Sequence, residues 1–122
     1  MKAIIGTLVC AALLIFSLGI HAQERVMLVL DASGSMWGQI EGVTKIEIAR
    51  DALKTLVKNW GDDREVGLVV YGHRRKGDCQ DIEVLVPVGP LDAARMVSLV
   101  DRINPKGKTP LSASVEVAAE AL

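Results

Sequence analysis

The chain has 122 residues, half of them hydrophobic, and its 14 basic and 15 acidic side chains give a net charge of −1 at neutral pH. This near-balance excludes the strongly basic surface that nucleic-acid binding requires, so no nucleic-acid partner is expected. The length suits one small domain, and no internal repeat or low-complexity segment interrupts the sequence.

The N-terminus has the pattern of a secretory signal peptide over residues 1–22. Lys2 supplies a positive start, an uncharged apolar run follows over residues 3–20, and the small residue Ala22 precedes the expected cleavage point. The apolar run approaches the length of a membrane span, so an uncleaved N-terminal anchor is the alternative. Both interpretations predict an exported protein, periplasmic or secreted, which contacts a membrane only if this segment remains attached.

An apolar run from Val26 to Leu30 predicts a strand buried on both faces, as in a parallel sheet covered by helices. Asp31 follows this strand directly, with Ser33 and Ser35 at two-residue intervals after it. Ligands of open α/β sheets bind at the carboxyl ends of the strands, so these side chains are expected at a ligand-binding edge. The alternative is structural, because Asp and Ser at a strand end also form turns and helix caps.

A helix is expected over residues 45–60. Thr44 precedes it and Glu47 follows three residues later, which is the sequence signature of a capping box. The apolar positions of this segment recur at helical spacing and share one face. They are Ile46, Ala49, Leu53, Leu56, Val57 and Trp60.

Strands are expected over residues 65–71 and 81–86, and two more helices follow them. Pro90 opens a helix over residues 91–103, and Pro110 opens another from residue 111. The last helix is expected to place Val115, Ala118, Ala119 and Leu122 on one face. Alternation of strands and helices predicts an α/β fold with a doubly wound, mostly parallel sheet and helices on both faces.

Two motifs resemble the metal-ion-dependent adhesion site of von Willebrand factor A (VWA) domains. The first is the Asp-x-Ser-x-Ser sequence, with Asp31, Ser33 and Ser35 in the three ligand places. The second lies in residues 105–111 and places Thr109 as a further ligand. The two motifs occur in the order that the family requires, which is a stronger signal than either alone.

The resemblance covers residues 25–122 and includes sequence segments similar to those of exported bacterial members of the family. It implies a VWA/Rossmann-like fold in which the strand at residues 81–86 is the antiparallel edge. It also implies a divalent-cation-dependent protein-binding or adhesion module. The ion would be Mg²⁺, or alternatively Mn²⁺ or Ca²⁺, and a partner protein would supply an acidic side chain to it.

The chemistry of these side chains agrees with a hard divalent cation. Mg²⁺ prefers about six oxygen ligands and keeps several waters. Hydroxyls add no charge, so the bound ion would remain electron-poor and attract an anionic oxygen from outside. The alternative function is a structural α/β domain of an exported assembly with a vestigial metal site.

The family's site has a further Asp on a strand that follows the third helix. No such strand precedes Leu122, so residues 23–122 are expected to be the N-terminal part of a VWA domain, truncated after the third helix, with the C-terminal half absent. Cys79 is the one cysteine outside the leader. Its expected partner is a cysteine in the absent half, with intermolecular pairing and a plain buried thiol as alternatives.

A basic cluster at residues 73–76 is expected at the same edge as Asp31. In one interpretation it is a solvated loop whose charges are compensated by the acidic residues that follow, Asp78, Asp81 and Glu83. In the other it forms a rim that attracts an acidic partner toward the ion.

Three enzymatic interpretations of these motifs are each excluded by a residue that the corresponding enzyme motif does not allow. The segment 107–109 looks like the end of a phosphate loop, but Arg102 stands where the first glycine belongs. Ser35 comes one place too early between its flanking glycines for a nucleophile elbow. A phosphoryl-transfer Asp31 lacks the second carboxylate two residues on, where Ser33 stands. No enzymatic activity is therefore expected.

Overall fold

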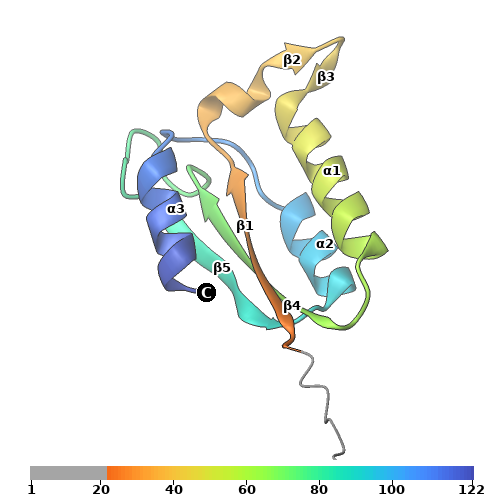
Figure 1. The fold of residues 1–122 in the computed structure, drawn as a ribbon. Coiled ribbons are helices and arrows are strands. Elements are labelled where there is room, and N and C mark those ends of the chain that lie inside the picture. Colours follow the sequence, from red (N-terminus) through yellow and green to blue (C-terminus); the bar gives the residue numbers. More distant parts are fainter. Residues whose placement is uncertain (1–21) are drawn as a thin grey trace, which may run out of the picture.

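The computed structural model describes residues 22–122, so the predicted signal peptide lies outside the described residues except for Ala22. The elements, in order, are β1 (Glu24–Asp31), the 3₁₀ turn η1 (Gly34–Trp37), β2 (Gln39–Ile40), β3 (Val43–Thr44), α1 (Lys45–Asn59), β4 (Arg64–Tyr71), β5 (Ile82–Pro90), α2 (Ala93–Asp101) and α3 (Leu111–Glu120) (Figure 1). None of the helices in this part of the chain is long and apolar enough to cross a membrane.

The main sheet has three strands in the order β1-β4-β5. β1 and β4 are parallel, and their register places Asp31 opposite Tyr71 at the carboxyl ends. β5 is antiparallel to β4 and ends the strand order. The mixed sheet with its parallel pair confirms the predicted α/β class. The antiparallel third strand implied by the VWA resemblance is also confirmed.

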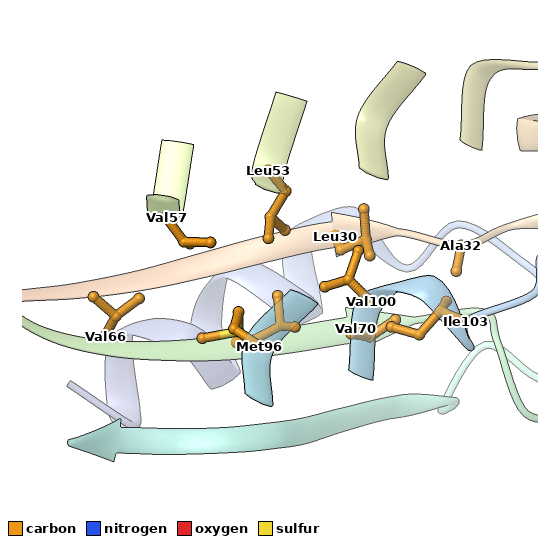
Figure 2. Close-up of a cluster of buried hydrophobic side chains, with 10 residues drawn as sticks. Leu30, Ala32, Leu53, Val57, Val66, Val70, Met96, Val100 and Ile103 are labelled. Atoms are coloured by element: carbon orange, nitrogen blue, oxygen red, sulfur yellow. The ribbon is translucent and has the colours of Figure 1, made fainter. Parts of the chain in front are cut away.

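Helices cover both faces of this sheet. α1 and α2 pack on one face over a core whose members come from both strands and both helices (Figure 2). Its buried members are Leu30, Ala32, Leu53, Val57, Val66, Leu68, Val70, Met96, Val100 and Ile103. α3 contacts β1, β4 and β5 and lies on the opposite side of the sheet from α1 and α2 (Figure 1). The sandwich of helices around a central sheet is the predicted arrangement.

The two parallel strands differ in burial. β4 is buried continuously from Val66 to Tyr71, whereas β1 has only Leu30 fully buried and leaves Val29 37% exposed. The expectation that the strand from Val26 to Leu30 is buried on both faces is therefore wrong for most of its length. β4 lies between two strands, whereas β1 has one hydrogen-bonded neighbour among the described residues.

Capping side chains set the start of both helices on the core face. The predicted capping box is confirmed: Thr44 Oγ1 accepts from the Glu47 N–H at 3.3 Å, and the Thr44 N–H donates to the Glu47 carboxylate at 3.3 Å. The predicted start of α2 at Pro90 is wrong, because Pro90 is the last residue of β5. Asp92 caps α2 instead and accepts from the Arg95 N–H at 2.9 Å. An Asp satisfies a free helical N–H, which proline cannot do.

α3 begins where it is predicted but presents a different face to the sheet. Ser114 and Ala118 are buried, whereas Val115 and Leu122 are about half exposed, at 52% and 46%. The Ser114 hydroxyl donates to the Pro110 carbonyl at 2.8 Å, so its burial leaves no unpaired polar atom there. Small side chains at the contact suit a helix packed close against a strand. Of the predicted apolar face of Val115, Ala118, Ala119 and Leu122, only Ala118 is buried.

Candidate metal site

Three loops meet beyond the carboxyl ends of β1 and β4. The first is residues 31–38, which begin with Asp31 at the end of β1, and the second is residues 72–81 after β4. The third, residues 104–110 before α3, crosses the end of the sheet (Figure 1). Backbone hydrogen bonds join all three. The Gly34 N–H donates to the Gly107 carbonyl at 2.9 Å, and the Gly107 N–H donates to the Gly72 carbonyl at 2.8 Å.

Two glycines permit this close approach. Gly72 has a φ of +75°, and a Cβ there would lie 2.6 Å from the Lys108 carbonyl oxygen and 3.0 Å from the Ser33 backbone. A Cβ on Gly107 would collide with the Arg75 carbonyl oxygen. Glycine is therefore required at both positions if the loops are to touch. Neither glycine could be assigned this role from the sequence, because the contact is made between segments far apart in the chain.

The structure brings the three residues of the first motif together. The Ser33 N–H donates to Asp31 Oδ1 at 2.8 Å, and the hydroxyl oxygens of Ser33 and Ser35 lie 3.2 Å apart. Ser33 is buried, Asp31 is partly buried and Ser35 is exposed. The oxygen cluster therefore begins inside the fold and opens to solvent.

The geometry of these oxygens fits a small divalent cation. Neighbouring ligands of an octahedral ion with metal–oxygen distances of about 2.1 Å lie about 3.0 Å apart. The separation of 3.2 Å between the Ser33 and Ser35 hydroxyl oxygens is close to that value. The Asp31 carboxylate has unused lone pairs after accepting from the Ser33 N–H. No group of three or more His, Cys, Asp or Glu side chains suited to a metal occurs within residues 22–122.

Thr109 lies in the loop that is attached to the first motif. Ser33 and Gly107 form a parallel β-bridge, and Thr109 comes two residues later with an exposed side chain. The Thr109 side chain makes no hydrogen bond to any residue that the structure describes. The fold thus brings the Thr109 loop against the motif of Asp31, but no hydrogen bond joins the Thr109 hydroxyl to the other three predicted ligands in the described part of the chain.

Tyr71 is a neighbour of the site that the sequence analysis did not assign. It is only 2% exposed and is paired with Asp31 across the parallel strands. Burial raises the pKa of the Tyr71 phenol above its ordinary range, and the nearby Asp31 carboxylate raises it further. The phenol therefore stays protonated at neutral pH. The sequence feature that could have indicated this pairing is the position of both residues at the end of a predicted strand.

Asp81 organises the loop after β4 from inside the fold. Its side chain is fully buried, and Oδ2 accepts from the backbone N–H groups of Arg74 and Arg75 at 2.7 and 2.8 Å. Oδ1 accepts from Arg74 Nε at 2.7 Å. Burial alone would raise the pKa of Asp81, but these hydrogen bonds outweigh it and hold the pKa below its ordinary value. Asp81 is thus a buried anchor of the loop rather than part of a solvated charge cluster.

Trp37 makes a side-chain connection between the first and third loops. Its indole Nε1–H donates to the Pro105 carbonyl at 2.9 Å, while half of the side chain remains exposed. The bond holds η1 against the segment that leads to Thr109. The two predicted motifs are therefore joined by a side chain as well as by the backbone.

Residues 26–122 match the family model of the von Willebrand factor type A domain. The chain is also 27% identical over 99 residues to the uncharacterized protein YwmD of Bacillus subtilis (strain 168). That alignment covers 75% of this chain and 44% of YwmD, so the chain spans less than half the length of this relative.

Several solved structures share the fold. An uncharacterized membrane spanning protein from Vibrio fischeri matches with a TM-score of 0.66 and 18% identity, over 80% of this chain and 48% of its own. An aerotolerance-related membrane protein from Bacteroides fragilis NCTC 9343 matches with a TM-score of 0.64 and 24% identity, over 79% of this chain and 45% of its own. The conserved hypothetical protein BatB from Bacteroides thetaiotaomicron matches with a TM-score of 0.64 and 20% identity, over 79% of this chain and 44% of its own. At these identities the likeness shows the fold alone.

Proposed function

Because the chain belongs to the von Willebrand factor type A domain family, we propose that it is a protein-binding module that captures its partner through a divalent cation. The observation that carries this proposal is the arrangement of Asp31, Ser33 and Ser35 at the end of β1, with two hydroxyl oxygens 3.2 Å apart beside a carboxylate. Such an oxygen set suits a hard cation and leaves room for ligands from outside.

The proposed ion is Mg²⁺, with Mn²⁺ and Ca²⁺ as alternatives of the same chemistry. Asp31, Ser33, Ser35 and Thr109 would hold it, and the only charged ligand among them is Asp31. A divalent ion with one anionic ligand keeps a net positive charge, so it attracts a carboxylate that a partner protein presents as Asp or Glu. Tyr71 lies beside the charged ligand, because the buried tyrosine is paired with Asp31 in the register of β1 and β4.

The proposed function is binding without catalysis. A serine nucleophile requires a base within hydrogen-bond reach. The hydroxyl of Ser35 pairs with that of Ser33, and His73 bonds Glu83 at 2.9 Å instead of a serine. The local chemistry therefore supports a site that holds a ligand and does not transform it.

We propose that the protein acts outside the cytoplasm in association with a membrane. The N-terminal pattern of Lys2 and the apolar run supports export. The Vibrio fischeri neighbour is described as membrane spanning and the Bacteroides fragilis neighbour as an aerotolerance-related membrane protein. At this level of identity these descriptions support the location only as an analogy between folds.

Calorimetric titration of Mg²⁺ and Mn²⁺ into the full-length protein tests the metal site. The wild-type protein is expected to bind one ion, and Asp31→Ala is expected to lose that binding while it keeps its circular dichroism spectrum. Asp62→Ala is the matched control, because Asp62 is an exposed carboxylate in the turn between α1 and β4. Equal uptake of metal by wild-type protein and Asp31→Ala would contradict the proposed site.

Partner capture in the presence and absence of a chelator tests the role of the ion. The immobilised wild-type protein is expected to retain its partner in Mg²⁺ and to release it in EDTA. Asp31→Ala is expected to retain none in either buffer. Equal capture in both buffers would instead support the alternative function, a structural domain of an exported assembly with a vestigial site.

A further inference from the structure

Three lysines beside the candidate site have no acidic partner among the residues that the structure describes. They are Lys76, Lys106 and Lys108, which are all exposed and are called the lysine rim below. The nearby carboxylates are already engaged. Asp78 pairs with Arg75 at 2.8 Å and Asp81 pairs with Arg74 at 2.7 Å.

The three loops of the site differ in charge from the chain as a whole. They contain five fixed basic side chains, Arg74, Arg75, Lys76, Lys106 and Lys108, against three acidic ones, Asp31, Asp78 and Asp81. The complete chain has a net charge of −1, so the remainder of the molecule is acidic. A cation bound at Asp31 would increase this asymmetry. Such a separation of charge attracts anions to one edge of the protein.

The lysine rim comes from two segments whose backbones lie against each other. Lys106 and Lys108 flank Gly107, whose N–H donates to the Gly72 carbonyl at 2.8 Å. Gly107 also lies against the Arg75 carbonyl oxygen, one residue before Lys76. The backbone thus fixes both lysine-bearing loops against each other. Thr109 follows Lys108 directly, so the rim adjoins a predicted metal ligand.

We propose that the partner recognised at this edge is an acidic polypeptide segment with several carboxylates, one that reaches the ion and others that pair with the lysine rim. This inference rests on the proposed function, because it assigns the first carboxylate to the cation. The rim then selects among acidic segments: a single Asp satisfies the ion alone, whereas a cluster satisfies the ion and the lysines together. Charge complementarity of this kind also raises the rate at which the two proteins associate and makes that rate sensitive to salt.

Fluorescence anisotropy with defined peptides tests the proposal on the full-length protein. The probes are a fluorescein-labelled decapeptide with four Asp separated by Ser and Gly, and the same peptide with a single Asp. In Mg²⁺ at low salt, the four-Asp peptide is expected to bind about tenfold more tightly than the single-Asp peptide, since exposed ion pairs contribute modestly and add up. The difference is expected to shrink at 0.3 M NaCl.

Neutral variants separate the rim from general charge effects. The triple variant Lys76→Gln, Lys106→Gln and Lys108→Gln is expected to bind both peptides equally weakly while it still takes up Mg²⁺. Lys58→Gln is the control for loss of a lysine, because Lys58 is exposed at the far end of α1 and makes no ion pair within residues 22–122. A triple variant that keeps the tenfold preference for four Asp would overturn the inference.

The same assay distinguishes failure of the rim from failure of the proposed function. If Asp31→Ala abolishes peptide binding but the triple variant does not alter it, the cation site stands and the rim inference is wrong. If the triple variant abolishes binding but Asp31→Ala and EDTA leave it unchanged, the rim binds acidic peptides and the cation-dependent function is wrong. A DNA oligonucleotide of equal charge that competes as well as the four-Asp peptide would overturn the assignment to an acidic polypeptide.

Discussion

Tyr71 and Asp31 end neighbouring parallel strands in direct register, and the Asp31 carboxylate adds to the effect of burial in raising the pKa of the Tyr71 phenol. The strand pairing links the predicted metal ligand to the most buried strand of the sheet. β1 is itself partly exposed, so β4 is the better buried of the two strands that end at this position. The site is thus supported from the neighbouring strand as well as from its own loop.

Tyr71 is the single tyrosine of the chain, so its ionisation can be followed directly by absorbance. In the folded protein without added cation, we expect no tyrosinate signal near pH 10, the ordinary value for the phenol. The folded-state pKa is raised, so the contribution of Tyr71 to stability is complete below about pH 10 and is lost as the pH rises beyond it. Tyrosinate absorbance near pH 10 with an unchanged far-UV spectrum would show that the phenol is not held as described.

Gly72→Ala is expected to lower the free energy of unfolding by about 1–3 kcal/mol, because a Cβ at positive φ would also meet the Lys108 carbonyl and the Ser33 backbone. Gly77→Ala is the matched control, since Gly77 has a similar φ of +78° but no atom within 4 Å of the added Cβ. Urea unfolding measures both variants. Equal losses would mean that the contact between the loops imposes no constraint.

Asp81→Asn is expected to lower the free energy of unfolding by roughly 2–4 kcal/mol, because it removes a buried charge from the two backbone N–H groups and the guanidinium that it satisfies. Asp51→Asn, at an exposed helical pair with Lys54, is the control and is expected to cost less than about 0.5 kcal/mol. Guanidinium unfolding at pH 7 measures both.

The pH dependence of stability gives a second test of Asp81. Its folded-state pKa is lowered, so its contribution is present above about pH 4 and is lost as the pH falls through the folded value. The thermal midpoint of the wild-type protein is expected to fall more steeply below pH 4 than that of Asp81→Asn. Parallel curves for the two proteins would show that Asp81 does not titrate as described.

Thr44→Ala is expected to destabilise the fold by about 1 kcal/mol, because it removes the side-chain half of the capping box at the start of α1. Thr55→Ala is the control, since Thr55 is exposed within the same helix and alanine has the higher helix propensity. Thermal unfolding is expected to show a lower midpoint for Thr44→Ala alone. A midpoint equal to that of Thr55→Ala would mean that the box contributes nothing measurable.

Features with local causes could be predicted from the sequence. The capping box at Thr44 and the start of α3 depend on neighbouring residues and were confirmed. The clustering of Asp31 with Ser33 and Ser35 also follows from short spacing at a strand end. The α/β class followed from the alternation of strands and helices, and the antiparallel edge followed from the family resemblance.

Features with tertiary causes could not be predicted in this way. The partial exposure of β1 depends on which strands flank it, and the face of α3 depends on how closely that helix approaches the sheet. The roles of Gly72 and Gly107 arise from contacts across the chain. Asp81 was interpreted as a surface charge because charged residues lie near it in the sequence. It is instead buried, and backbone N–H groups and Arg74 hydrogen-bond its carboxylate. Each of these features depends on the tertiary arrangement of the chain, which a local sequence pattern does not specify.

The loop that bears Thr109 is fixed largely by main-chain atoms. The Lys106 N–H donates to the Ala32 and Gly72 carbonyls at 3.1 and 3.0 Å, and the Gly107 carbonyl accepts from Gly34. None of these bonds depends on which side chain stands at positions 106 or 108. Substitutions there can therefore change the charge of this edge while the loop keeps its main-chain bonds, so the edge can diverge in sequence on one constant backbone.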